Sequence, residues 1–361
     1  MTYKEKIQQL IDKIPTTIVD WSVERVRSKA PTQAFSEFLT NREQGDWAER
    51  LVLSAINALS EDLVAVHYGK SDARIAGEEG FEQFYEAYQD ELDTIGKRPD
   101  ILVLKKSDYD VAWNYNISSL PKNQLDVVVP KGVAGIEIRS SSFLIEKYDA
   151  EIQRKQNIYK NVALSTKILI LENYIDLLTP EWIALLNSIN ETNLGIISFR
   201  VPNRRSSQRL VELTNLFKDL KDALTRIQKR DFLSITPKVE DIKVVHLWTQ
   251  TYNVPHFYFQ VFFDKVYGIS FEQILELISD SSNEGQKFFV EGGDVKNQNK
   301  TTIKINSKVG KEIAYKVDFP NHKSQVKELD RGRLLFHVTF EGGTAYLNVT
   351  NLFDLLNLKS S

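Results

Sequence analysis

The sequence predicts a mixed α/β fold of the α+β kind, in which helices flank a central mixed sheet. Short apolar runs are typical of buried strands, and longer stretches carry apolar residues at helical spacing. From the N-terminus these patterns follow the order helix, three strands, helix, strand, helix, strand. Helices covering both faces of a mixed sheet are the natural packing for such an order. After Pro237 strand patterns dominate, so the C-terminal part is expected to be β-rich.

Composition narrows the class of protein. Of 361 residues, 42% are apolar and 26% charged, with a formal net charge of −3, as in ordinary globular proteins. The absence of cysteine excludes disulfides and cysteine zinc sites and favours a reducing compartment. The N-terminus lacks a signal-peptide core, and no run of about 18 apolar residues occurs. We therefore expect a cytoplasmic protein without a membrane span.

The first 40 residues are expected to form an N-terminal helical and basic arm. Residues 3–14 have the pattern of an amphipathic helix, and residues 21–31 are basic and irregular. Thr40 and Glu43 then form a capping-box pattern, which predicts a helix beginning at Thr40. The apolar stripe of this helix has regular helical spacing and consists of Trp47, Leu51, Val52, Ala55, Ile56 and Leu59. Glu49 lies at the flank of this stripe, where its side chain can reach the rim of a pocket.

Residues 41–236 are expected to form the core of the protein. Strands are predicted at residues 63–68, 99–104, 133–138, 166–171 and 194–199. Besides the helix after Thr40, helices are predicted near residues 146–161, 180–187 and 209–229, and residues 71–95 are expected to form loop and helix. The last helix has a long apolar stripe, typical of a helix docked on a sheet or of a dimer or interdomain contact.

Residues 237–361 are expected to form the β-rich part. Strands are predicted at residues 256–264, 288–291, 301–306, 314–318 and 334–340. The glycine pairs at residues 292–293 and 342–343 indicate turns, and Thr350 is a candidate cap for a final short helix.

Two of the predicted strands carry acidic residues where a core strand is normally apolar. Asp100 precedes the apolar run at residues 101–104, and period two places Glu137 and Arg139 on one face of the strand at 133–138. Burying a carboxylate is costly unless a positive group holds it. If the strands pair, Asp100 and Glu137 converge on one point, as two carboxylate ligands of Mg²⁺ would. A surface ion pair between Glu137 and Arg139 is the alternative interpretation.

This arrangement resembles the PD-(D/E)xK nuclease superfamily, with the motif written here as Pro99-Asp100 and Glu137-Ile138-Arg139. Members usually carry a glutamate on a preceding helix, the place that Glu49 takes. Three stretches are similar to type II restriction endonucleases of the AccI kind: residues 28–49, 96–100 and 135–143.

The resemblance implies a restriction-endonuclease-like core and a Mg²⁺-dependent, sequence-specific endonuclease acting on double-stranded DNA. Asp100 and Glu137 would bind the metal with the backbone carbonyl near Ile138, and Glu49 would orient a water or a second ion. A palindromic target would require a two-fold homodimer. A repair or recombination nuclease on the same core, or a non-catalytic nucleic-acid-binding protein, remains an alternative.

The sequence departs from the family's pattern at Arg139, where lysine is usual. A guanidinium is effectively never deprotonated, so Arg139 is excluded as a general base. It can instead hold a phosphate and stabilise the charge that develops during attack.

Two acid-free basic stretches are candidate DNA contacts. Between residues 295 and 311 lysines alternate with amides, which can hold phosphates and read base edges. The second stretch follows residue 199. A solvated surface is the alternative for both. The candidate residues are Arg200, Arg204, Arg205, Lys296, Asn297, Gln298, Asn299, Lys300 and Lys304.

Overall fold

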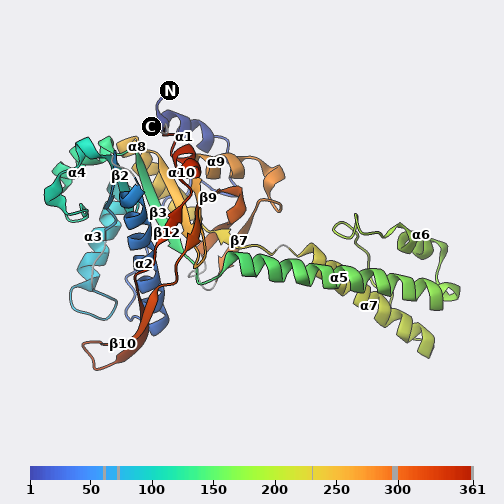
Figure 1. The fold of residues 1–361 in the computed structure, drawn as a ribbon. Helices are drawn as coiled ribbons and strands as arrows, with labels where there is room; N and C mark the ends of the chain where they lie inside the picture. Colours follow the sequence, from blue (N-terminus) through green and yellow to red (C-terminus); the bar gives the residue numbers. More distant parts are fainter. Residues whose placement is uncertain (60–61, 71–73, 230, 295–299, 359–361) are drawn as a thin grey trace. The chain divides into compact units, whose positions relative to one another are not determined.

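The computed structural model describes residues 1–59, 62–70, 74–229, 231–294 and 300–358 (Figure 1). These residues form two compact units. The first comprises residues 1–145 and 233–361, and the second comprises residues 146–232. The predicted mixed α/β class is confirmed. No described helix is long and apolar enough to cross a membrane.

A seven-stranded mixed sheet is the centre of the first unit, in the order β1-β2-β3-β5-β6-β9-β12. All neighbours in it are antiparallel except β3 and β5, which are parallel. Three strands come from the N-terminal part of the chain and four from residues beyond 255. The strands are β1 (Leu63–His67), β2 (Ile101–Lys105), β3 (Ala134–Ser140), β5 (His256–Val261), β6 (Val266–Ser270), β9 (Lys311–Val317) and β12 (Ala345–Leu347).

Helices cover both faces of this sheet. On one face, α2 (Ser36–Leu59) and α10 (Val349–Leu355) bury an apolar core that includes Trp47 and Phe259. On the other face, one core contains Trp248 and a second contains Phe271. The helices that contribute to these two cores are α1 (Tyr3–Ile11), α4 (Lys122–Val128), α8 (Val239–Tyr252) and α9 (Phe271–Ser279). The sheet is therefore the middle layer of a three-layer unit. In the sequence, helix α3 (Phe81–Thr94) follows β1.

Two smaller sheets complete the first unit. One is a three-stranded sheet of β4 (Ser234–Ile235), β8 (Lys300–Asn306) and β7 (Phe288–Asp294), and the other is the hairpin of β10 (Asn321–Glu328) and β11 (Leu334–Glu341). The hairpin is fastened to α2, because the Val338 amide donates to the Thr40 hydroxyl at 3.2 Å. The prediction that this helix begins at Thr40 is wrong, because α2 starts four residues earlier, at Ser36.

The second unit contains helices and no strand among its described residues. It consists of α5 (Ile145–Asn173), α6 (Pro180–Ser188) and α7 (Gln208–Gln228), which pack around a core that includes Phe217. The unit itself begins at residue 146, the second residue of α5. The strands expected at 166–171 and 194–199 are therefore wrong. Residues 166–171 lie inside α5, where Ile170 packs in this core, and residues 194–199 form turns and irregular chain. Short apolar runs do not distinguish a strand from a helix segment by their pattern alone.

We expect the buried histidine of β5 to make the fold acid-sensitive. His256 has no exposed surface, and its ring lies against Trp248, Tyr258 and Phe271 at centroid distances of 5.1–6.0 Å. Burial, with a contribution from the positive charge of Lys97, lowers its pKa to about 3. Because the unfolded state binds a proton near pH 6.5, the stability that neutral His256 supports is complete above that pH and declines toward pH 3.

His256→Phe is expected to flatten the acid side of the stability profile. Between pH 7.5 and pH 5 the parent should lose about 2 kcal/mol of unfolding free energy that the variant retains. Urea unfolding at several pH values measures the difference in unfolding free energy between parent and variant. Burial also lowers the pKa of His246, to about 4, but this contribution is present in both proteins and cancels in the difference. Parallel pH profiles for parent and variant would contradict this prediction.

Candidate functional site

Strand pairing brings the two predicted metal-binding acids together. β2 runs antiparallel to β3, with Ile101 opposite Ile136, so Asp100 and Glu137 occupy the next position outward on the two neighbouring strands. Asp100 Oδ2 accepts a hydrogen bond from the Ile138 amide at 2.6 Å, which fixes its carboxylate against the motif strand. Its backbone oxygen accepts from the amides of Tyr68 and Gly69, so the residue is held from both sides.

Glu137 is almost completely buried, with 2% of its surface exposed. Its Oε1 lies 2.5 Å from Lys97 Nζ and 3.0 Å from Arg139 Nη2, whereas its buried Oε2 has no hydrogen-bond partner. Asp241, from the first turn of α8, contacts the same two cations: its Oδ2 is 2.9 Å from Arg139 Nη2 and 3.7 Å from Lys97 Nζ. Glu137 is thus one member of a cluster of two cations and two carboxylates, which we call the Lys97–Asp241 cluster.

The carboxylates near Asp100 repel one another. Burial and the charge of Glu137 raise the pKa of Asp100 to about 7 against the opposing effect of Lys97. Burial and the charges of Asp100, Asp46 and Glu137 raise the pKa of Glu49, on α2, to about 9. The Glu49 carboxylate faces His67 at 3.5 Å, and burial lowers the pKa of that imidazole. A cation among these groups would relieve the repulsion.

The cations of the Lys97–Asp241 cluster stay charged despite their burial. Burial alone would lower the pKa of Lys97 and of Arg139, but the carboxylates of Asp241 and Glu137 outweigh that effect and raise both. The cluster therefore supplies two lasting positive charges beside Glu137.

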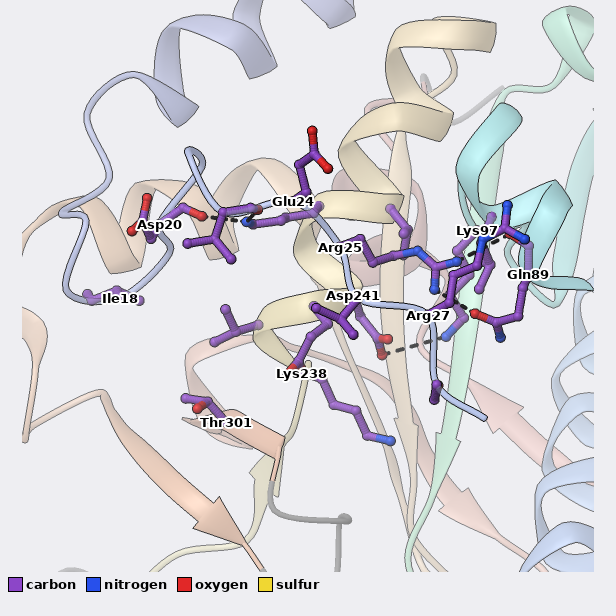
Figure 2. Close-up of a pocket in the computed structure, with 18 of the residues that line it drawn as sticks. Ile18, Asp20, Glu24, Arg25, Arg27, Gln89, Lys97, Lys238, Asp241 and Thr301 are labelled. Carbon is purple, nitrogen blue, oxygen red and sulfur yellow. Dashed lines mark hydrogen bonds and ion pairs between the residues drawn. The ribbon is translucent and has the colours of Figure 1, made fainter. Parts of the chain in front are cut away.

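Two cavities of the first unit reach these residues. One, of about 720 Å³, is lined by Glu49, His67 and Asp100 together with the cationic residues Arg42, Arg50, Lys70 and Arg74. The other, of about 760 Å³, is lined by Lys97, Arg139 and Asp241 (Figure 2). Figure 2 shows Asp241 at the beginning of α8, with the segment that carries Asp20, Glu24, Arg25 and Arg27 crossing in front. Asp100 and Arg139 thus open toward different cavities, and Glu137 is in neither lining.

The donor set fits a hard divalent cation. Asp100 and Glu137 offer two carboxylates on adjacent strands, and Glu137 Oε2 is a buried oxygen that no donor satisfies. Among the described residues, no group of three histidine, cysteine, aspartate or glutamate side chains is arranged to hold a metal. Mg²⁺ needs fewer protein carboxylates than that, because it usually keeps waters and takes substrate phosphate oxygens.

The predicted DNA contacts that the structure describes belong to both units. Arg200 and Arg205 are exposed in the second unit, and Arg204 is half-buried, donating to the Leu177 carbonyl at 2.8 Å. Lys304, on β8, pairs with Glu291 at 3.0 Å. Lys296, Asn297, Gln298, Asn299 and the side chain of Lys300 lie outside the described residues.

Two residues of the site escape sequence reasoning. Lys97 stands inside the quoted motif stretch, but no pattern assigns its side chain to Glu137. Asp241 lies about 100 residues after the motif, on a helix with no strong periodic pattern. Only the packing of α8 against the sheet brings them together, since the Lys97 amide donates to the Val244 carbonyl at 3.0 Å.

Comparison with known proteins gives one match. The sequence model of the AccI restriction endonuclease family matches residues 1–361, the whole chain. No curated protein and no solved structure matches the chain.

Proposed function

The chain belongs to the AccI restriction endonuclease family, a family of sequence-specific DNA endonucleases, and from this premise we propose that it is a type II restriction enzyme. It hydrolyses phosphodiester bonds of double-stranded DNA with Mg²⁺. The observation that carries the proposal is the adjacency of Asp100 and Glu137 on paired strands, beside the permanently charged Arg139.

We propose the following roles for the residues of the site. Asp100 and Glu137 hold the metal with the backbone carbonyl of Ile138, and Glu49 orients a water or a second ion. The ion, when bound, polarises the scissile phosphate and lowers the pKa of a bound water. Arg139 donates to the phosphate and stabilises its developing negative charge, because its guanidinium remains protonated at every working pH.

Residues 237–361 are proposed as the β-rich part that recognises the DNA target. β7 and β8 are an antiparallel pair within the three-stranded sheet, and residues 295–299, part of the lysine and amide segment, join them in the sequence. A two-stranded ribbon fits the major groove, where amide and lysine side chains read base edges. Arg200, Arg204 and Arg205 are proposed phosphate contacts. Residues 1–40 are proposed as a helical and basic N-terminal arm, and residues 41–236 as the nuclease core. A homodimer is proposed for a palindromic target.

Incubation with a long DNA of known sequence tests the proposed function. With Mg²⁺ we expect a small set of discrete fragments whose ends share one short sequence, and with excess chelator we expect intact DNA. The chelator arm is the internal control, because it separates metal-dependent cutting from a contaminating metal-independent activity. A smear would contradict sequence specificity, and binding without any cutting would contradict an enzyme.

A further inference from the structure

Asp241 is the one acid of the Lys97–Asp241 cluster that lies outside the motif. It shares both cations with Glu137, at 2.9 Å from Arg139 and 3.7 Å from Lys97. All four side chains are largely shielded from water, with exposed fractions of 15% for Lys97, 33% for Arg139, 2% for Glu137 and 19% for Asp241. At this burial a cation that loses its counter-charge is costly, so the two carboxylates together determine where both cations lie.

The backbone holds Asp241 in place against these cations. Gly96 adopts a φ of +83°, and a Cβ there would lie 2.2 Å from the Val244 carbonyl oxygen. Only glycine allows such a close approach of the chain to α8. Trp248 of α8 also lies where a Cβ on Gly135 would be, at 2.8 Å, so the helix is seated directly on the motif strand. This packing sets the distance between Asp241 and the cations independently of Glu137.

The cluster has two carboxylates for two cations, and one of the carboxylates is a proposed metal ligand. A carboxylate that binds a divalent cation is less available as a counter-charge for neighbouring ammonium and guanidinium groups. Without a second acid, Lys97 and Arg139 would both remain on Glu137 and compete with the metal. Asp241 offers them another partner within the same cavity.

We propose that Asp241 is a positioning residue for cleavage: it keeps Lys97 and Arg139 beside the scissile phosphate and frees Glu137 for the metal. The proposal rests on the metal-dependent endonuclease function proposed above. It adds a residue from α8, distant in sequence, on which both the metal affinity and the reaction depend.

The test compares Asp241→Asn with Glu240→Gln, which changes the neighbouring carboxylate of the same helix turn and lines the same cavity. The first readout is the affinity for Mn²⁺, measured by calorimetry on the full-length protein without DNA. Asp241→Asn should weaken Mn²⁺ binding about tenfold, the effect typical of losing a group that orients metal ligands. Glu240→Gln should bind Mn²⁺ like the parent.

The second readout is the split between kcat and KM for a duplex that carries the target sequence. At saturating metal, Asp241→Asn should lower kcat about 10- to 100-fold and leave KM within a few-fold, because Arg139 and Lys97 are displaced from the phosphate and the DNA-reading surface is unchanged. Asp241→Glu, which keeps the charge, should restore much of both kcat and Mn²⁺ affinity, and it serves as the test variant if Asp241→Asn does not fold.

The outcomes separate this inference from the proposed function. If the parent binds Mn²⁺ and cuts DNA but Asp241→Asn matches it in both readouts, the role of Asp241 is overturned. A loss of activity that follows a lower melting temperature at unchanged Mn²⁺ affinity also overturns it, since that is the result of a merely structural ion pair. If the parent neither binds Mn²⁺ nor cuts DNA, the proposed function itself fails.

Discussion

Asp100→Asn is expected to abolish DNA cleavage and leave the fold intact. The amide oxygen can still accept the hydrogen bond from the Ile138 amide, so the link between β2 and β3 is kept. The charge that would bind the metal is lost, and a loss of about 4 kcal/mol of transition-state stabilisation corresponds to roughly 10³-fold in rate. Single-turnover cleavage of a duplex with the target site measures the effect.

The same substitution should not lower the stability of the metal-free protein. The pKa of Asp100 is raised to about 7 by burial and by the charge of Glu137, so its ionised form is unfavourable in the folded state. Removing that charge should raise the melting temperature slightly at pH 8. The matched control is Asp108→Asn. Asp108 lies close to the C-terminal end of the same strand, and its carboxylate pairs with Lys131. Cleavage by Asp100→Asn within threefold of the parent would refute its assignment as a ligand.

Arg139→Ala is expected to lose cleavage almost completely, whereas Arg139→Lys keeps a measurable rate. Arg139 Nη2 contacts both Glu137 and Asp241, and its Nε is buried without a hydrogen-bond partner. Removing one donor that stabilises developing charge costs about 10²- to 10³-fold in kcat. Lysine restores the charge without the two-pronged geometry of the guanidinium, so an intermediate rate is expected.

The ratio of the two variants is the informative quantity, because both remove the guanidinium. Each should be assayed for DNA binding without metal as well as for cleavage. Comparable binding with a large difference in cleavage supports a role in the reaction. Equal cleavage by Arg139→Ala and the parent would exclude the proposed role of Arg139.

The sequence predicted the strands that carry the site because their signals are local. The runs at 63–68, 99–104 and 133–138 correspond to β1, β2 and β3, and an apolar strand flanked by an acid at its end remains recognisable without tertiary information. The stripe around Trp47 likewise marked α2. The helix at 209–229 was predicted nearly to its ends, since a stripe of seven apolar residues at helical spacing admits few other structures.

What the sequence did not show depends on contacts between distant segments. The apolar run at 166–171 has the composition of a strand, and only its packing against α7 around Ile170 shows it to be helical. Helix α8 was not predicted, because apolar residues surround most of its circumference and leave little amphipathic contrast: Ile242, Val244, Val245 and Trp248 are all buried. Asp241 is therefore found only in the folded molecule.

The position of a bound divalent ion tests the central claim most directly. Crystals grown with Mn²⁺ and an uncleavable duplex containing the target sequence would give an anomalous scattering peak. We expect that peak within direct coordination distance of carboxylate oxygens of both Asp100 and Glu137, about 2.0–2.3 Å for such ligands. A peak elsewhere, with Glu137 still held by Lys97 and Arg139 and no ion at Asp100, would contradict the account.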